Sequence, residues 1–371
     1  MVHCEFARGI YRLVVGKPGG VFSSSGEVVA LAYVDDILLS SNCVNLLNEV
    51  IQHLSSEIEI ESGNVNEDCM FLGIDLQITK RSEQTIVSLS AQQALEGIAK
   101  LAGVGPPGRR PRASPSTSVT LPIVKAPPSR DDLSAEQKLY AVILGMIQHV
   151  VRFVRIDLQW ACNRLARGSC NPSPEHLSEL YRMVEYLRDT AGLKLTYGNQ
   201  DATYFTTEPV VFSDANYVGK GERSTSGVVV MYAGAAVIHR SKRQEIPSTS
   251  AAESELYALE AAIKAAVYVR KVATDMDISF ENKLWLFGDN KASLAWANSH
   301  MTRNTMKHFL EQLRYAQFMV PRIPVELGYV KTADNVADLA TKHLEGQTLR
   351  KLRDVVLGLF EGDAEFPSLP K

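Results

Sequence analysis

The stretches Pro209-Val-Val-Phe-Ser-Asp214-Ala-Asn216 and Arg223-Ser-Thr-Ser-Gly-Val-Val-Val-Met-Tyr-Ala-Gly234 decide the fold of this chain. Both are rich in apolar and β-branched residues, which predicts two buried strands joined by a turn. The first predicted strand ends in the carboxylate of Asp214. An acid at the exit of a core strand is costly to bury unless it is paired or binds a metal ion. The rest of the sequence should therefore supply partners for Asp214.

A regular order of predicted elements surrounds these strands. A turn at Ala233-Gly234 leads into a third strand, and a capping box formed by Ser250 and Glu253 begins a long helix. The predicted strands are residues 210–214, 227–233, 235–240, 283–289 and 325–330, and the predicted helices are residues 251–272, 292–297, 305–320 and a last one around 336–340. This order predicts an α+β or α/β domain in which a five-stranded mixed sheet carries helices on both faces.

Four acids occupy positions that this topology can bring together. Asp214 and Asp289 end two central strands. Glu255 lies in the first turns of the long helix, and Asp338 lies on the last one. Clustered carboxylates repel one another without a counter-ion, so their convergence implies bound divalent metal. Oxygen ligands favour Mg²⁺, with Mn²⁺ as the alternative, and two such ions about 4 Å apart could drive the hydrolysis of a phosphodiester.

Seven short motifs between residues 210 and 344 resemble, in order and spacing, the ribonuclease H of copia-type retrotransposons. They are Ser213-Asp-Ala215, Arg223-Ser-Thr-Ser-Gly227, Ser241-Lys-Arg-Gln244, Glu253-Ser-Glu-Leu-Tyr-Ala-Leu259, Asp289-Asn290, Lys307-His308 and Ala337-Asp-Leu-Ala-Thr-Lys342. The resemblance implies a ribonuclease H-like fold and cleavage of RNA in RNA–DNA hybrids with two Mg²⁺ ions. It implies that the catalytic and metal-binding residues are Asp214, Glu255, Asp289 and Asp338, with Asp214 bridging both ions. The expected nucleic-acid contacts are Arg223, Ser224, Lys242, Arg243, Asn290, Lys307 and His308.

Three positions have competing interpretations. Glu253 competes with Glu255 for the catalytic place, although the capping box already gives Glu253 a structural task. Asp334 competes with Asp338, although its place before the last helix predicts a helix cap. His308 is equally consistent with a phosphate contact and with a surface helix residue.

A second motif lies near the start of the chain. Residues 27–40 place Asp35 and Asp36 between two apolar runs, which predicts a hairpin with both acids at its tip. Tyr33-Val-Asp-Asp36 in this frame resembles the catalytic hairpin of copia-type reverse transcriptases. A helix over 44–54 and a strand over 71–78 are expected to follow. Phosphoryl transfer needs a further carboxylate from another strand, and the preceding residues offer none that resembles it. We therefore expect a vestigial polymerase site here and no polymerase activity from this chain alone.

The resulting domain organisation is that of the C-terminal part of a Pol polyprotein. Residues 1–103 are interpreted as a truncated reverse-transcriptase palm, and residues 104–130, rich in Pro, Ser and Gly, as a linker or loop. Helical periodicity over residues 131–200 predicts a connecting segment, which includes Arg155-Ile-Asp157 where the resembling family has Arg-Pro-Asp. Residues 205–345 form the predicted nuclease and residues 346–371 a C-terminal tail.

Composition limits the alternatives. The 371 residues are 45% hydrophobic and 22% charged, and no run of 18 apolar residues is present, so we expect no membrane partner. We expect an intracellular protein, cytoplasmic and particle-associated or nuclear, whose partners are an RNA–DNA hybrid and a missing polymerase segment in cis or in trans. A net charge of −3 argues weakly against nucleic acid as a partner. The rival hypotheses are a non-catalytic relic or co-opted nucleic-acid-binding protein, and a transposase or integrase of the same broad fold.

Overall fold

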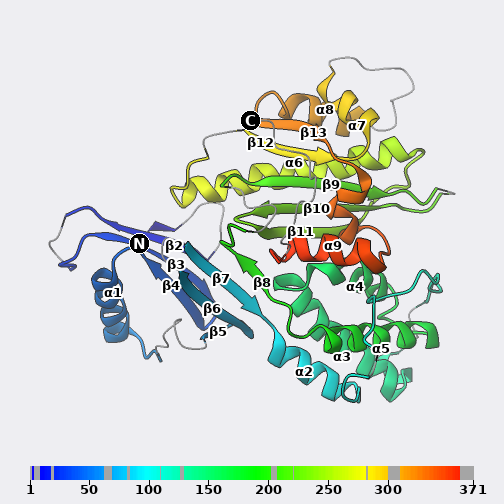
Figure 1. Cartoon of the computed structure of the whole chain (residues 1–371), viewed down its shortest axis with the longest axis horizontal. Helices are drawn as coiled ribbons and strands as arrows, with labels where there is room; N and C mark the ends of the chain where they lie inside the picture. Colours follow the sequence, from blue (N-terminus) through cyan, green and yellow to red (C-terminus); the bar gives the residue numbers. More distant parts are fainter. Residues whose placement is uncertain are drawn as a thin grey trace. The chain divides into compact units, whose positions relative to one another are not determined.

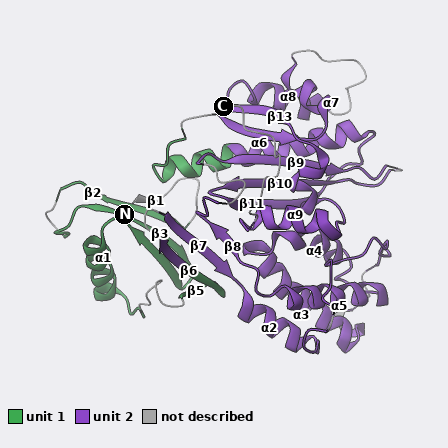
Figure 2. Ribbon diagram, in the orientation of Figure 1, with its two compact units in different colours: residues 1–77, 267–281 green, residues 78–266, 282–371 purple. Residues whose placement is uncertain are grey.

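The computed structural model describes residues 2–3, 9–17, 21–61, 69–81, 84–108, 110–125, 129–201, 207–219, 221–280, 283–299 and 310–359. These residues divide into two compact units, shown in two colours in Figure 2. The first comprises residues 1–77 and 267–281, and the second comprises residues 78–266 and 282–371. The second unit contains the predicted connecting segment and the predicted nuclease region apart from residues 267–281, which belong to the first unit.

The first unit contains the expected hairpin at Tyr33-Val-Asp-Asp36. Its four-stranded sheet has the order β1-β2-β3-β4, with β1 at Val2–His3, β2 at Ile10–Val15, β3 at Gly26–Tyr33 and β4 at Asp36–Ser41. Tyr33 pairs with Asp36 across a two-residue turn in which Val34 has a φ of 52°. Helix α1, Val44–Glu57, packs Leu46 and Val50 against Val28 of β3. The predicted hairpin and helix are therefore confirmed.

The strand predicted for residues 71–78 is present in large part but is interrupted by a turn at Leu72-Gly73. The chain forms β5, Cys69–Phe71, and β6, Ile74–Arg81, which pair antiparallel. Leu72 and Gly73 between them have φ values of 55° and 73°. Two successive residues in the left-handed region make the tight turn of a two-residue hairpin. The apolar run that suggested one strand is therefore two short strands.

The five-stranded sheet of the second unit follows the predicted order (Figure 1). Its strand order is β11-β10-β9-β12-β13, with β9–β11 antiparallel and β12 parallel to both β9 and β13. The strands are β9 Val210–Asn216, β10 Thr225–Tyr232, β11 Ala235–Arg243, β12 Leu284–Gly288 and β13 Val325–Tyr329. Ala233 and Gly234, with φ values of 51° and 92°, form the expected turn between β10 and β11.

The helices after β11 match most of the predicted ones. They are α6 Ala251–Asp275, α7 Lys291–Asn298 and α8 Leu310–Met319, and the 3₁₀ turns η4 Thr332–Asp334 and η5 Val336–Ala340 replace the predicted last α-helix. At the start of α6, Ser250 Oγ accepts from the backbone N–H of Glu253 as expected. The Glu253 carboxylate, however, accepts from the backbone N–H and hydroxyl of Thr249, at 2.7 and 2.6 Å. Glu253 is thus occupied in holding the helix start.

Asp334 is not the cap that its position suggested. Asn335 begins η5, and its side-chain oxygen accepts from the backbone N–H of Ala337. The carboxylate of Asp334 instead pairs with Lys351 at 2.6 Å. Residues 346–356, placed in a tail by the sequence analysis, form helix α9, Gly346–Val356, which buries Leu349 and Leu352.

The two faces of the sheet are distinguished by side-chain alternation. Successive residues of a strand point to opposite faces. Gly227 of β10 lies on the face covered by η5, because a Cβ there would be 2.5 Å from Thr341 Cγ2 and 2.8 Å from the Ala337 carbonyl oxygen. Ser226 lies on the other face, where Gln244 bonds both its hydroxyl and the Ser254 carbonyl of α6, each at 2.9 Å.

The connecting segment consists of helices that pack within the second unit. They are α3 Ala135–Phe153, the 3₁₀ turn η2 Ile156–Leu158, α4 Gln159–Ala166 and α5 Pro174–Asp189, and strand β8 Leu195–Tyr197 follows them. Strand β7, Gln84–Ser90, which pairs with β8, and helix α2, Gln92–Leu101, precede this segment and lie in the region expected to be the palm. The proline-rich stretch before α3 has no helix or strand over its described residues 110–125. It is nevertheless fixed, because Arg164 of α4 donates to the carbonyls of Thr117 and Val119, at 2.6 and 2.7 Å.

A buried ion pair holds the junction between α3 and α4. Arg155 and Asp157, both without exposed side-chain surface, form two hydrogen bonds of 2.9 and 2.8 Å. The Tyr186 hydroxyl donates to Asp157 at 3.0 Å, and Thr190 accepts from Arg155 at 2.9 Å. Burial is the largest single effect and raises the pKa of the Asp157 carboxyl, but the charge and hydrogen bonds of Arg155, with smaller effects of Arg353 and Tyr186, outweigh it and lower this pKa overall. The Arg-x-Asp spacing thus matters more than the residue between them.

Replacing Asp157 with alanine should destabilise the second unit by about 3–5 kcal/mol, because the Arg155 guanidinium would remain buried without its counter-ion. Urea unfolding measures this change. Tyr186→Phe is the matched control, since it removes one hydroxyl from the same network and should cost about 1 kcal/mol. Equal losses in the two variants would contradict a dominant role for the pair.

Candidate metal centre

Asp214 lies at the buried end of the central strand β9. Its side chain is 1% exposed. In register it faces Gly227 of β10, the residue that lets η5 approach the sheet. Thr341, which follows η5, donates its hydroxyl to one carboxylate oxygen of Asp214. The packing of η5 on the sheet therefore fixes the orientation of this carboxylate.

Three of the four predicted acids converge. Oxygen atoms of Asp214, Glu255 and Asp289 all lie within 4.8 Å of one another. They come from β9, from the second turn of α6 and from the residue after β12. Parallel pairing of β9 with β12 brings the first and third to the same edge of the sheet. Three carboxylates at this separation form a suitable ligand set for a hard divalent cation such as Mg²⁺.

The fourth acid faces a lysine. Asp338 of η5 is 4% exposed, and its carboxylate lies 2.9 Å from Lys342 Nζ. The same ammonium group lies 3.5 Å from an oxygen of Asp214. Lys342 therefore supplies a positive charge between these two carboxylates, which partly offsets their repulsion.

Further side chains fix the backbone and the acids. Asn335 donates to the Ser213 carbonyl at 2.9 Å and so joins the start of η5 to β9. Thr332 donates to Asp289 at 2.7 Å. Asn290, a predicted nucleic-acid contact, caps α7 by accepting from the backbone N–H groups of Ala292 and Ser293, each at 3.0 Å.

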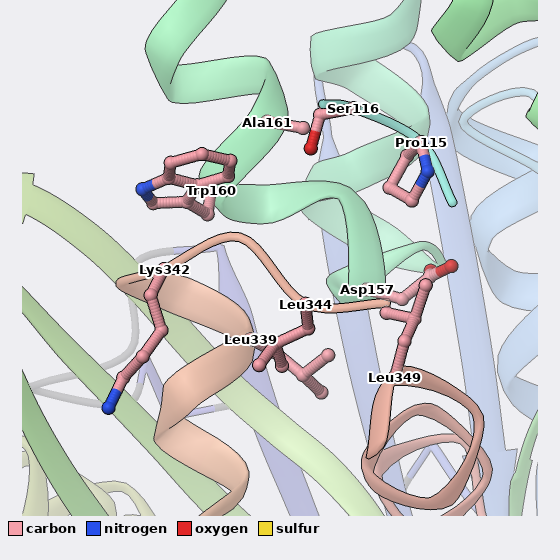
Figure 3. Close-up of a pocket in the computed structure, with 9 residues that line it drawn as sticks. All are labelled: Pro115, Ser116, Asp157, Trp160, Ala161, Leu339, Lys342, Leu344 and Leu349. Carbon is pink, nitrogen blue, oxygen red and sulfur yellow. The ribbon is translucent and has the colours of Figure 1, made fainter. Parts of the chain in front are cut away.

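The loop that carries Lys342 is held from the side of the connecting helices. A small pocket beneath it is lined by residues such as Pro115, Trp160 and Leu349, and in Figure 3 the Lys342 side chain extends away from Pro115 and Leu349. The ring of the next residue, His343, is bonded to Ser116 Oγ at 3.1 Å and lies 6.1 Å from the Trp160 ring. The ammonium group thus extends to the carboxylates from a fixed backbone.

The acids strongly disfavour simultaneous ionisation. Burial and then the charges of Asp214 and Asp289 raise the pKa of Glu255 to about 9. Burial and then the charge of Asp214 raise the pKa of Asp338 to about 8, against the opposing effect of Lys342. Burial likewise raises the pKa of Asp214. A bound divalent cation would reverse this balance because it stabilises all the carboxylates in their charged form. The donor set therefore fits a hard metal ion.

The other predicted nucleic-acid contacts differ from one another in exposure and in pairing. Arg223 is exposed, Lys242 is exposed and paired with Glu245 at 3.0 Å, and Arg243 is half-buried. Ser224 is fully buried. Lys307 and His308 lie outside the described residues.

In the described structure, the predicted polymerase hairpin does not bring together a set of metal ligands. Tyr33, Asp35 and Asp36 are exposed on their hairpin. Among the described residues, the acids at this turn do not form a group of three with metal-binding spacing. The hairpin therefore provides two carboxylates without a third partner in the described residues.

Sequence reasoning missed three side chains that complete the candidate centre. Thr341 and Lys342 belong to the Ala337–Lys342 motif without a predicted role, and Asn335 lies two residues before that motif. Thr341-Lys342 lies three and four residues after Asp338, so one further helical turn places both on the side of the acid. That spacing was the available signal.

Comparisons with known proteins show that most of the chain is distantly similar to retrotransposon polyproteins. It is 26% identical over 321 residues to the "Retrovirus-related Pol polyprotein from transposon RE1" of Arabidopsis thaliana, an alignment covering 85% of this chain and 21% of that protein. It is 24% identical over 343 residues to the "Transposon Ty1-JR2 Gag-Pol polyprotein" of Saccharomyces cerevisiae, covering 90% and 19%. The chain is thus a distant homologue of copia- and Ty1-type polyproteins and spans about a fifth of their length. No family model matches it.

Solved structures similar to this chain are ribonucleases H. RNase H1 from Halobacterium salinarum is 18% identical, with 39% of this chain and 98% of that one covered and a TM-score of 0.29. The LC11-RNase H1 structure in complex with an RNA/DNA hybrid is 15% identical, with 36% and 94% covered and the same score. The ribonuclease H-like fold is itself evident in the order β11-β10-β9-β12-β13 and its strand directions. No helix among the described residues is long and apolar enough to cross a membrane.

The raised carboxyl pKa values predict an unusual pH dependence of stability in the absence of metal. A carboxyl group whose pKa is higher in the folded than in the unfolded protein stabilises the fold below about pH 4, and this stability is lost as the pH rises toward about 8–9. Melting temperature in a chelator should therefore fall over this window, and Asp338→Asn should flatten the fall. The control is Asp131→Asn, which changes an exposed acid. Identical pH profiles for parent and Asp338→Asn would contradict the prediction.

Proposed function

We propose that the second unit is a metal-dependent ribonuclease H that hydrolyses the RNA strand of RNA–DNA hybrids. The observation that carries the proposal is the convergence of Asp214, Glu255 and Asp289 at the exit of β9, with Asp338 beside them. Homology to Pol polyproteins supports the retroelement context. The hybrid-bound RNase H1 that is similar in fold suggests the substrate class.

Each acid has a distinct place in the proposed mechanism. Asp214, Glu255 and Asp289 would hold divalent metal through their carboxylates, and Asp338 would add a fourth carboxylate beside Asp214. Bound Mg²⁺ would supply Lewis acidity to the attacking water and to the leaving 3′ oxygen. Thr341 and Asn335 keep Asp214 and its strand in position, and Thr332 orients Asp289. Lys342 balances the charge of Asp338 and Asp214.

The first unit is proposed to correspond to a different functional part of the polyprotein. We assign the Tyr33-Val-Asp-Asp36 hairpin to the polymerase part of the same polyprotein, since the homology extends over most of the chain. Polymerisation would require a further carboxylate from a polymerase segment supplied in cis or in trans. The nuclease proposal does not depend on this segment.

Cleavage of a labelled RNA–DNA hybrid in Mg²⁺ tests the proposed function. Asp214→Asn and Asp289→Asn should each reduce the rate at least about 100-fold, more than is typical for residues that only support metal ligands. Both changes remove charge from a repulsive cluster, so the metal-free variants should melt no lower than the parent. Asp131→Asn, in an exposed 3₁₀ turn, is the matched control and should cleave normally. Hybrid binding without cleavage by the parent would favour the non-catalytic alternative.

Two glutamates of α6, Glu253 and Glu255, offer a sharper comparison. Glu255→Gln should abolish cleavage with little loss of stability. Glu253→Gln weakens the hydrogen bonds to Thr249 that hold the helix start, so it should lower the free energy of unfolding by about 1–2 kcal/mol and leave cleavage measurable. Rates and urea unfolding of the two variants decide between them. The reverse pattern would assign the catalytic place to Glu253.

A further inference from the structure

One row of polar side chains crosses the ends of β10 and β11. Thr225 and Arg243 are direct partners in register, as are Gly227 and Ser241. Direct partners in an antiparallel pair point to the same face, and so do residues two apart. Arg243 and Thr225 therefore lie on the face of Gly227, whereas Lys242 lies on the opposite face.

Helix α4 of the connecting segment lies against this row. Asn163 donates to the carbonyl and hydroxyl of Ser241, at 3.2 and 2.8 Å. One turn later, Arg167 donates to the Thr225 hydroxyl at 3.3 Å. Residues four apart share one face of a helix. The contact of Asn163 thus fixes Arg167 beside Arg243 at the end of the sheet.

These arginines are not neutralised within the described residues. Ion pairs are present at Arg164, with Glu179 at 3.3 Å, and at Lys242, with Glu245. In the described part of the chain, Arg167, Arg223 and Arg243 have no carboxylate within ion-pair distance, and Arg243 Nε is buried without a hydrogen-bond acceptor. Burial is the main cause that lowers the pKa of the Arg167 guanidinium, and the nearby positive charge of Arg243 lowers this pKa further.

We propose that Arg167, Arg223 and Arg243, with the Thr225 hydroxyl, form a binding site for a backbone phosphate of the nucleic-acid substrate. Guanidinium groups bind phosphate through paired, charge-assisted hydrogen bonds, and the buried Nε of Arg243 lacks such an acceptor. Arg223, two residues before Thr225, adds an exposed positive charge. The connecting segment thereby contributes directly to substrate binding through Arg167.

The position of this site relative to Asp214 suits a long substrate. Thr225 pairs with Asn216, two residues beyond Asp214 on β9, which is a distance of about 7 Å along the strand. Arg243 lies two strands across, about 10 Å away. The site and Asp214 point to the same face of the sheet, so a phosphate bound here would lie a few nucleotides from the cleaved bond, at about 3.4 Å of helix rise per nucleotide.

Equilibrium binding of a fluorescent RNA–DNA hybrid to the full chain in chelator, at several salt concentrations, tests the inference. Arg167→Gln should weaken binding about tenfold and reduce the magnitude of the salt slope by about one. Arg167→Gln combined with Arg243→Gln should reduce it by about two. Arg167→Lys should retain most of the salt slope while binding less tightly than the parent, because it keeps the charge and loses the guanidinium fork.

The matched control is Arg152→Gln, which makes the same chemical change at an exposed arginine of α3. The Arg152 carbonyl is bonded by His239, four residues from Arg243 along β11. The control should leave both affinity and salt slope unchanged. Melting curves for all variants exclude unfolding as a cause. Equal effects of Arg152→Gln and Arg167→Gln, or no effect of either, would overturn the inference.

This site rests on the proposed nuclease function for its substrate, but the two can fail separately. If the parent cleaves the hybrid and Arg167→Gln binds it like the parent, the phosphate site is wrong and the nuclease stands. If the parent binds but never cleaves, and binding still depends on Arg167, the phosphate site stands and the nuclease is wrong. Where both hold, Arg167→Gln should raise KM and leave kcat within about twofold, since its site is remote from the acids.

Discussion

Burial of the Asp214 carboxylate is the constraint on which the second unit depends. A charged group at the end of a central strand is unfavourable unless nearby groups compensate it. The sheet places Glu255 and Asp289 close by, which increases the repulsion, and η5 brings Thr341 and Lys342, which reduce it. The acids that could hold a metal ion therefore destabilise one another, and Thr341 and Lys342 offset this cost.

Gly227 connects this electrostatic arrangement to the fold. Its missing side chain leaves space for Thr341 and for the Ala337 carbonyl. A larger residue would displace η5 from the sheet, and with it both Asp338 and the lysine that faces it. The glycine of the Arg-Ser-Thr-Ser-Gly motif therefore permits the close packing that positions Asp338 and Lys342 of the Ala-Asp-Leu-Ala-Thr-Lys motif.

Much of the fold could be predicted because its signals are local. Hydrophobic periodicity located every strand of the five-stranded sheet, and the ordered acids located its candidate metal centre. The errors occurred where backbone geometry or long-range contacts decide. Leu72 adopts a positive φ that its residue type does not suggest. Thr249, Asn335 and Arg167 act through partners that only the folded chain brings near them.

The contacts of the proline-rich stretch limit how independent the ribonuclease H-like sheet is of the residues that precede it. Ser116 and Trp160 hold His343, directly after the lysine that faces Asp338, although they precede the sheet by many residues. A recombination event that joined a foreign sequence to this sheet at residue 205 would transfer all four acids but leave that loop unsupported. Exchange among retroelements would preserve the arrangement only if the breakpoint fell upstream of Ser116, so inheritance of the connecting helices and of the ribonuclease H-like sheet should be linked.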